Sequence, residues 1–348
     1  MTDDKIDILS YDLAQLTELM AEMGQKPFRA RQLFEWLHSR RVHGFDEMTN
    51  LSSALRAELS ERCTICAPQK VAEAKSRDGT VKYLLEYADG ARVETVAMQY
   101  EHGMSVCLST QVGCRMGCTF CATGKSGFER SLTAGEILAE LYAVCELSHT
   151  RADSIVLMGM GEPLDNYDAV MRFIDLACDA SGLNLSARSV TLSTCGLVPQ
   201  IERLADEHRQ LTLSVSLHAT SDEKRTAMMP VNKKWPLGEL IPACRRYFDK
   251  TGRRLSFEYA VIAGTNNGED DAVALAGIAK SVRAHINLIP VNPAADPNMR
   301  ATRAQAEAFA ARLREMGANA TVRRTLGQDV DAACGQLRRR EGLRKNTD

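Results

Sequence analysis

Three cysteines fall within one short segment, GCRMGCTFC, at Cys114, Cys118 and Cys121. A structural zinc site normally closes its tetrahedron with four ligands, commonly as two separated cysteine pairs, and this segment offers no obvious fourth ligand. Three thiolates can instead hold a [4Fe–4S] cluster and leave one iron open to another molecule. The spacing therefore favours an iron–sulfur cluster with a free coordination position over zinc or unliganded thiols.

A second cysteine motif, CTIC, has the spacing of a redox pair at Cys63 and Cys66. No second pair and no histidine partner follows at metal-ligating spacing, and the motif stands at the predicted end of a helix. We interpret it as incidental.

The composition is typical of a soluble globular protein, with 45% hydrophobic and 25% charged residues among 348. No signal peptide is predicted, and no segment approaches the roughly 20 apolar residues that span a bilayer. We therefore expect a cytoplasmic protein with no membrane partner, in which most of the 11 cysteines are reduced thiols.

The net charge of −2 argues against a protein that coats nucleic acid by bulk electrostatics. Local basic groups nevertheless recur, and they keep a structured RNA partner open. They lie at Lys26–Arg41, at Lys233–Lys234 beside Trp235, and at Arg338–Arg340.

The elements that position the cysteines are predicted from hydrophobic periodicity. Residues 1–70 have a helical pattern and form a small accessory domain, and residues 71–103 form a β-hairpin extension from the runs 81–87 and 91–100. From residue 104 to 325 strand-like and helix-like segments alternate as six βα units, with a Thr133/Glu136 capping box opening one helix. Six units imply a parallel sheet with fewer strands than a closed barrel, so the predicted fold class is α/β with a partial (βα)6 barrel. The strands are expected near 105–110, 153–160, 188–194, 211–218, 255–264 and 285–291, with one more short strand in ATVRRT.

Small, polar or glycine-rich clusters follow most of these strands. In parallel α/β sheets the chemistry gathers on loops at the C-terminal ends of the strands. The cysteine segment follows the first strand, and the others are GMGEP (159–163), STCG (193–196), SLHAT (216–220) and IPVNP (289–293). Their common position predicts one active-site rim.

The chain resembles the RlmN family of radical S-adenosylmethionine (AdoMet) enzymes, which methylate C2 of adenine in RNA. The resemblance covers nearly the whole chain, from KPFRARQLFEWLH in the accessory domain through VCLSTQVGCRMGCTFC, MGMGEP, LSTCG and SVSLHAT to VRRTLGQDVDAACGQL. The tail motif DAACGQL is the most discriminating, because general radical AdoMet enzymes lack it. The resemblance implies an RNA-binding role for residues 1–70 and a tail, residues 326–348, that folds over the active site.

The resemblance also implies the cofactors and partners. The cofactors are a [4Fe–4S] cluster held by the three cysteines and two molecules of AdoMet per turnover. The implied substrates are adenosine 2503 of 23S rRNA and adenosine 37 of tRNAs. The implied electron donor is flavodoxin or ferredoxin, and a monomer is expected.

Three further residues receive chemical roles from the resemblance. Cys334 is the methyl carrier, and Cys107 is the thiol that resolves the covalent RNA adduct through a disulfide with Cys334. Glu94 matches the family's proposed proton acceptor, and either Glu94 or Cys107 could remove the C2 proton. The implied AdoMet contacts are Gly161, Glu162, Ser193, Ser216, Leu217, His218 and Asn292.

Two alternatives stay open. The CATG sequence after the third cysteine also occurs in the sister enzymes that methylate C8 of the same ribosomal adenosine, so a C8 methyltransferase is the alternative reading. A non-catalytic iron–sulfur RNA-binding protein is a second alternative, and the presence of both Cys107 and Cys334 argues against it.

Overall fold

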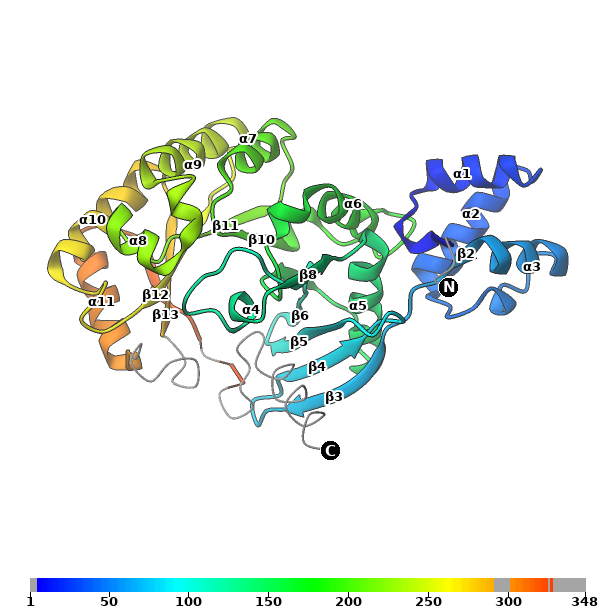
Figure 1. The fold of residues 1–348 in the computed structure, drawn as a ribbon, viewed down its shortest axis with the longest axis horizontal. Helices are drawn as coiled ribbons and strands as arrows, with labels where there is room; N and C mark the ends of the chain where they lie inside the picture. Colours follow the sequence, from blue (N-terminus) through cyan, green and yellow to red (C-terminus); the bar gives the residue numbers. More distant parts are fainter. Residues whose placement is uncertain (1–4, 291–300, 325, 328–348) are drawn as a thin grey trace.

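The structure is a computed structural model that describes residues 5–290, 301–324 and 326–327. Its N-terminal part is a small helical unit (Figure 1) made of α1 (Leu13–Glu22), α2 (Phe28–Phe34), the π-helix η2 (Glu35–Arg40) and α3 (Ser53–Arg62). The apolar positions of the predicted helical faces are buried, as expected for amphipathic helices, at Leu33, Phe34, Trp36, Leu37, Leu51, Leu55 and Leu59.

The Cys63–Cys66 segment differs from the prediction that it ends a helix. Helix α3 stops at Arg62, and β2 (Cys63–Thr64) then pairs in parallel with β1 (Ile6–Asp7). Cys63 is buried, and burial raises the pKa of its thiol to about 11. The two cysteines are both free thiols.

One sheet of ten strands organises the rest of the described chain, in the order β14-β13-β12-β11-β10-β9-β6-β5-β4-β3. From β6 to β14 in this order, each strand pairs in parallel with the next. The six predicted parallel strands and the additional short one are therefore confirmed. They are β6 (Gly103–Cys107), β9 (Ser154–Leu157), β10 (Val190–Thr194), β11 (Thr212–Ser216), β12 (Ser256–Val261), β13 (His285–Pro290) and β14 (Ala320–Val322).

The predicted hairpin is present as β4 (Val81–Glu86) and β5 (Arg92–Tyr100), but it is not a separate extension. Strand β5 pairs antiparallel with β6, so the hairpin continues the main sheet. A further edge strand, β3 (Gln69–Lys75), was not predicted, because its sequence QKVAEAK is charged and mostly exposed. The boundary placed at residue 70 therefore falls inside a strand.

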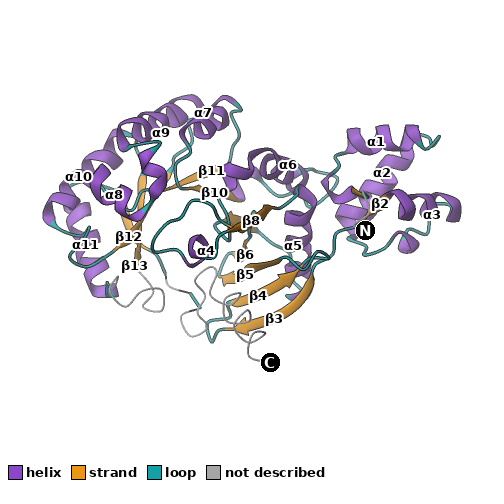
Figure 2. Cartoon of the chain, in the orientation of Figure 1, coloured by secondary structure: helices purple, strands orange, loops and turns teal. Residues whose placement is uncertain are grey.

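Helices lie along the outside of the curved sheet (Figure 2). They are α5 (Ala134–Leu147), α6 (Tyr167–Cys178), α7 (Val198–Asp206), α9 (Leu237–Thr251), α10 (Glu269–Ser281) and α11 (Arg303–Glu315). The capping box of Thr133 and Glu136 opens α5 as predicted. Shorter elements lie in the connecting segments: α4 (Ala122–Lys125), α8 (Asp222–Met228), β7 (Gln111–Gly113) and β8 (Phe128–Ser131), with 3-10 turns at Ile8–Ser10, Phe45–Glu47, Pro163–Asn166, Ala187–Ser189 and Pro230–Lys233.

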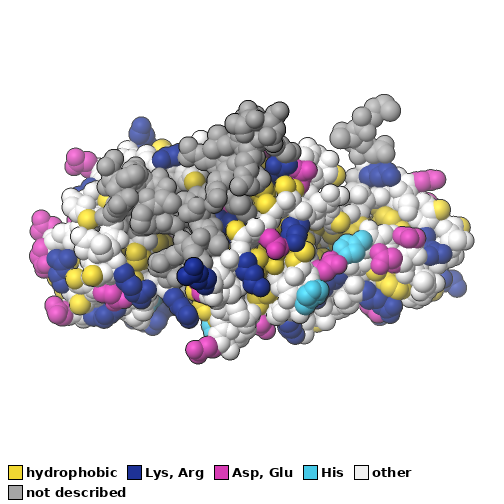
Figure 3. All heavy atoms as spheres, turned by 90° about the horizontal axis from the view of Figure 1, so that it is seen from below, with side chains coloured by type: hydrophobic (Ala, Val, Ile, Leu, Met, Phe, Trp, Pro, Cys, Tyr) yellow, Lys and Arg dark blue, Asp and Glu magenta, His cyan; other side chains and the backbone are white. Residues whose placement is uncertain are grey.

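The surface carries charges of both signs. Figure 3 shows Lys and Arg side chains interspersed with Asp and Glu on the face seen from below, in keeping with the net charge of −2. Within the described ranges, the helices are too short or too polar to cross a membrane.

Candidate active site

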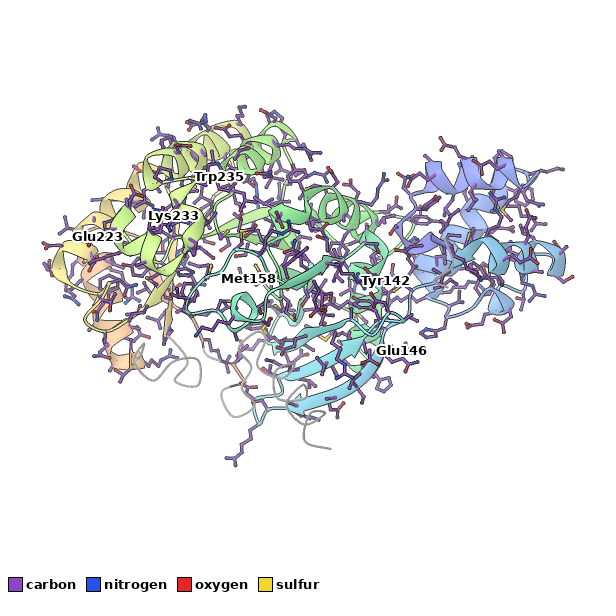
Figure 4. All side chains as sticks on the ribbon, viewed as in Figure 1. Tyr142, Glu146, Met158, Glu223, Lys233 and Trp235 are labelled. Carbon is purple, nitrogen blue, oxygen red and sulfur yellow. The ribbon has the colours of Figure 1, made fainter. Side chains whose placement is uncertain are left out.

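A cavity of about 440 Å³ opens at the C-terminal ends of the parallel strands. All three cysteines of the CxxxCxxC segment line it, and so do Cys107 at the end of β6 and Met158 after β9. Met158 lies near the centre of the molecule in Figure 4, between the helices and the β3–β5 strands. The loops that were predicted to form one active-site rim therefore border a single cavity.

The cysteine segment is held by backbone contacts at both of its ends. Strands β7 and β8 pair on either side of it, and the Cys114 amide donates to the Gly127 carbonyl at 2.9 Å. Gly113 has φ +79°, and a Cβ there would stand 1.9 Å from the Gly127 carbonyl oxygen, so only glycine fits this approach. Further along, the Thr119 amide donates to the Met228 carbonyl at 3.0 Å, which ties the segment to the end of α8.

The three cysteines offer the donor set of an iron–sulfur cluster but not a preassembled metal site. Within the described residues, no three His, Cys, Asp or Glu side chains converge closely enough to hold a metal ion as they stand. Burial raises the pKa of Cys114 to about 11 and of Cys118 to about 12, so both are protonated thiols until a metal displaces the protons. Three soft thiol donors that line one cavity fit a [4Fe–4S] cluster, which would be held by Cys114, Cys118 and Cys121.

Glu162 joins two neighbouring loops of the rim. Its carboxylate accepts from the Cys195 amide at 2.7 Å and from the Leu164 amide at 3.0 Å. Glu162 also lines the cavity, and a carboxylate can accept from a ligand's ammonium group. Glu162 can therefore brace the loops and bind a cation at the same time.

Gly161, one of the implied AdoMet contacts, is positioned by the packing of its loop. In the structure it has φ +101°, and a Cβ would stand 2.6 Å from the Gln111 Cβ. Glycine is therefore required by the packing of the loop against β7, although Gly161 also borders the cavity.

The candidate AdoMet contacts after β10 and β11 separate into two groups. Ser193, Ser216 and His218 border the cavity. Leu217 does not: its side chain is fully buried, and its amide donates to the Glu258 carbonyl at 3.0 Å. Any role of Leu217 at the cofactor therefore passes through its backbone.

His218 is held as a neutral imidazole. Burial lowers its pKa to about 3, and its Nδ1 accepts from the Ala260 amide at 2.9 Å. Since Nδ1 is the acceptor, Nε2 carries the proton and is the donor available to a ligand. The ring stands edge-on to Phe120 of the cysteine segment, with 4.8 Å between the centroids.

Glu94 and Cys107 lie on the same face of the sheet. Cys107 pairs with Val96, and Glu94 is two residues from Val96 on β5, so both side chains point to the side that carries the cavity. Cys107 is buried in a small apolar cluster with Val96 and Met98. The two candidates for removal of the C2 proton are thus close neighbours in the sheet.

Lys82 is a site residue that sequence analysis did not single out. Its ammonium group lies 3.0 Å from the Glu94 carboxylate, and both side chains are buried, at 0% and 2% exposure. Lysine in the strand VKYLLEY gave no signal, because exposed lysines are common in strands of this kind. Only the register of β4 against β5 brings the two residues together.

We predict that Lys82→Met lowers the free energy of unfolding by about 3–5 kcal/mol, because it leaves the Glu94 carboxylate buried without its cation. The Lys82→Met/Glu94→Gln double variant should recover most of this loss. Urea denaturation gives the measurement, with Arg40→Met, which breaks the exposed Arg40–Glu35 pair, as the control. Equal effects of Lys82→Met and Arg40→Met would contradict the prediction.

Glu140 on α5 is a second buried carboxyl group behind the site. It accepts from the Ser109 amide at 2.9 Å and from the Thr95 hydroxyl. The Ser109 hydroxyl in turn donates to the Glu94 carbonyl at 2.8 Å and accepts from the Met160 amide at 3.0 Å. Burial raises the pKa of Glu140 to about 8, so it is largely protonated at neutral pH. This network fixes the backbone of Glu94 to the GMGEP loop.

Two predicted site residues, Asn292 and Cys334, lie outside the described residues. The chain before Cys334 is described as far as Gly327. Leu326 borders the cavity and packs against the Cys107 cluster, and the Gly327 amide donates to the Asp78 carboxylate at 2.8 Å. Cys334 follows Leu326 by eight residues, a segment that reaches at most about 28 Å when extended.

Comparison with known proteins identifies two regions of the chain. Residues 6–65 match the family model of the ribosomal RNA large subunit methyltransferase N-terminal domain, and residues 108–276 match the radical SAM superfamily. The chain is 48% identical to the probable dual-specificity RNA methyltransferase RlmN of Clostridium perfringens (strain 13), over 96% of both chains. It is 46% identical to the protein of the same name in Geobacillus kaustophilus, over 96% of this chain and 93% of that one.

A solved structure is also similar over nearly the whole length. It is a radical SAM methyltransferase from Sphaerobacter thermophilus, with a TM-score of 0.90 and 43% sequence identity over 95% of this chain and 98% of that one.

Proposed function

The chain belongs to the RlmN family of radical AdoMet methyltransferases, and from this premise we propose that it methylates C2 of adenine in both 23S rRNA and tRNA. Family membership makes it an RNA methyltransferase that uses a [4Fe–4S] cluster and AdoMet. The proposal concerns the position on the base, the two RNAs and the residues that carry the carbon.

One observation supports the residue roles most directly. One cavity is bordered by the three cluster cysteines, by Cys107 and by Leu326, the first residue of the tail. A methyl carrier must meet AdoMet, the cluster and the adenine in turn, and Cys334 follows Leu326, which borders this cavity, by only eight residues in the sequence. We assign Cys334 as the methyl carrier and Cys107 as the thiol that releases the product.

The chemistry of adenine explains why a protein thiol is needed. C2 lies between two ring nitrogens and is electron-poor, so it does not attack a sulfonium methyl group, whereas a thiolate does. A [4Fe–4S] cluster held by Cys114, Cys118 and Cys121 would, together with AdoMet, supply a 5′-deoxyadenosyl radical able to remove a hydrogen atom from the methyl group on Cys334. The resulting methylene radical, still bonded to the Cys334 sulfur, adds to C2, and the RNA is then covalently joined to the protein.

Release of the product requires loss of the C2 proton and of one electron, which the oxidised cluster could take back, so that the adduct is no longer a radical. It then requires cleavage of the bond between the carbon and the Cys334 sulfur. Glu94 is held by Lys82 as a buried pair at 3.0 Å, which orients its carboxylate as a proton acceptor. Attack of the Cys107 thiolate on the Cys334 sulfur forms a disulfide, and the released methylene carbon takes up a proton to become the methyl group. Glu94 and Cys107 share one face of the sheet, so either group could accept the C2 proton.

Exposed cations and aromatic rings offer contacts for RNA in a cytoplasmic setting. In the accessory domain Phe28 is 49% exposed, and the Arg29 guanidinium lies 4.9 Å from its ring centre. On the barrel, Lys233 and Lys234 are exposed beside Trp235, with the Lys234 ammonium 4.5 Å from the indole centre. Figure 4 places Lys233 and Trp235 on the α8–α9 side of the molecule. Both groups combine a phosphate contact with a surface on which a base can stack.

We predict that the Lys233→Ser/Lys234→Ser double variant binds substrate RNA more weakly and with less dependence on salt. The magnitude of the negative slope of log affinity against log salt should fall by about one to two, since each lost phosphate contact reduces it by roughly one. Filter binding at several salt concentrations gives the measurement. Lys250→Ser is the control, because Lys250 is engaged with Asp206. A salt slope that does not differ from the control would exclude this surface.

Mass spectrometry of nucleosides tests the proposed function as a whole. RNA from cells that lack the gene should lose 2-methyladenosine from both 23S rRNA and tRNA, and the gene supplied in trans should restore it. Loss of 8-methyladenosine would identify the C8 alternative. No change in either nucleoside would identify a non-catalytic RNA-binding protein.

A further inference from the structure

Arg225 on α8 is a fully buried cation beneath the active-site rim. Its exposure is 0%, and its hydrogen bonds within the described residues go to neutral acceptors. Nη2 donates to the Cys195 carbonyl at 2.6 Å and the Ser216 carbonyl at 3.2 Å, Nε to the Leu217 carbonyl at 3.2 Å, and Nη1 to Asn232 Oδ1 at 2.8 Å. The guanidinium group thus ties the loops after β10 and β11 together.

The charge of Arg225 has no direct counter-charge in the described part of the chain. No carboxylate there forms an ion pair with it, and the Asp222 carboxylate is reached only through the side chain of Asn232, whose Nδ2 donates to it at 3.0 Å. An arginine side chain does not lose its proton in proteins, and a buried charge is costly unless an opposite charge lies near it. A negative group is therefore expected close to Arg225 in the working enzyme.

The cluster segment is the anionic neighbour that the fold provides. Arg225 lies on α8, and the Met228 carbonyl in the last turn of this helix accepts a hydrogen bond from the Thr119 amide of the cysteine segment. Gly117 packs over Pro230, with 3.7 Å between an added Cβ and the proline ring. Arg225 also donates to the Cys195 and Ser216 carbonyls, and both of these residues border the cavity that the three cysteines line. A cluster held by the three cysteines would therefore place negative charge in the cavity that Cys195 and Ser216 border.

We propose that Arg225 is the buried counter-charge of the iron–sulfur cluster and raises the potential at which the cluster accepts its electron. A low-potential one-electron donor protein loses one electron and the cluster gains it, so the cluster becomes more negative by one charge. A fixed cation stabilises the reduced cluster more than the oxidised one. Two unit charges about 10 Å apart, at an effective dielectric constant of about 20, shift such an equilibrium by roughly tenfold or more. Arg225 is a positioning residue, since it acts through the cluster and the loops.

This inference depends on the cluster and not on the position that is methylated. An enzyme that methylates C8 would need the same counter-charge, so failure of one proposal leaves the other standing.

The test is a redox titration of the reconstituted full-length protein, followed by the electron paramagnetic resonance signal of the reduced cluster in the absence of AdoMet. Arg225→Met should shift the reduced-to-oxidised ratio about tenfold towards the oxidised form. This corresponds to a midpoint potential lower by about 59 mV for a one-electron couple. Arg225→Lys keeps the charge and should retain most of the wild-type potential. Arg209→Met is the control, because Arg209 is paired with Asp175 and Glu207 outside the cavity.

Asn232→Asp provides a variant that keeps Arg225 in place. A carboxylate at this position would pair with the guanidinium group and neutralise it, so the potential should fall as in Arg225→Met. If Arg225→Met does not bind about four irons, Asn232→Asp decides the question. A wild-type midpoint potential in Arg225→Met, or in Asn232→Asp if Arg225→Met does not bind the cluster, overturns the proposal. An equal fall of the potential in Arg225→Lys and Arg225→Met also overturns it.

Discussion

Alanine in place of Cys114, Cys118 or Cys121 should abolish both iron binding and AdoMet cleavage. The three thiols are the donors that fit a [4Fe–4S] cluster in this cavity. With two thiolates the cluster loses a ligand on one iron and does not persist. Iron analysis and visible absorption after anaerobic reconstitution should show about four irons in the wild-type protein and almost none in each variant. The yield of 5′-deoxyadenosine under reducing conditions should fall by at least about a thousandfold, because the electron for AdoMet cleavage has no route.

Cys178→Ala is the matched control for these variants. Cys178 is a free, half-buried thiol on α6, similar in exposure to the three cysteines but outside the cavity. The Cys178→Ala variant should bind iron and cleave AdoMet as the wild-type protein does. Stoichiometric zinc in place of iron in anaerobically purified wild-type protein would contradict the cluster assignment.

The second large effect is expected at Cys334. The Cys334→Ala variant should bind its cluster and still cleave AdoMet, yet transfer no methyl group to RNA, because adenine C2 does not attack a sulfonium methyl. Protein purified from cells should carry one added methylene, about 14 Da, on the peptide that contains Cys334, as expected for a methylated thiolate. Peptide mass spectrometry and RNA methylation with labelled AdoMet give the two measurements.

Cys107→Ala separates the carrier from the resolving thiol. Without Cys107 the bond between Cys334 and the RNA should form but not break, so a covalent protein–RNA adduct should accumulate on denaturing gels. Cys66→Ala is the control, since Cys66 belongs to the CTIC motif that we interpret as incidental. Normal RNA methylation by Cys334→Ala would exclude this mechanism.

Much of this architecture could be predicted from sequence because its signals are local. The parallel strands read as apolar runs bounded by glycine or polar residues, and the capping box of Thr133 and Glu136 marks the start of α5. The cysteine segment, Gly161, Glu162, Ser193 and Ser216 then fall at one rim, because parallel strands end on the same side. Successive parallel strands of the series lie next to one another in the sheet, as short connections favour.

The features that could not be predicted depend on contacts between distant segments. Strand β3 is too polar to be recognised and is defined by its pairing with β4. Lys82 meets Glu94 only through the register of β4 and β5. Arg225 looks like a surface residue of a charged helix, and its burial appears only when α8 packs under the loops after β10 and β11. Pairing and packing of this kind leave no periodic pattern in the sequence.

The path of the methyl carbon tests the central claim most directly. With AdoMet that carries a fully deuterated methyl group, the carbon should pass through Cys334 and lose one deuterium to 5′-deoxyadenosine before it reaches the RNA. We therefore expect 2-methyladenosine that retains two deuterium atoms, together with singly deuterated 5′-deoxyadenosine, by mass spectrometry. A methyl group that arrives on C2 with all three deuterium atoms would show direct polar transfer and contradict the radical route through a protein cysteine.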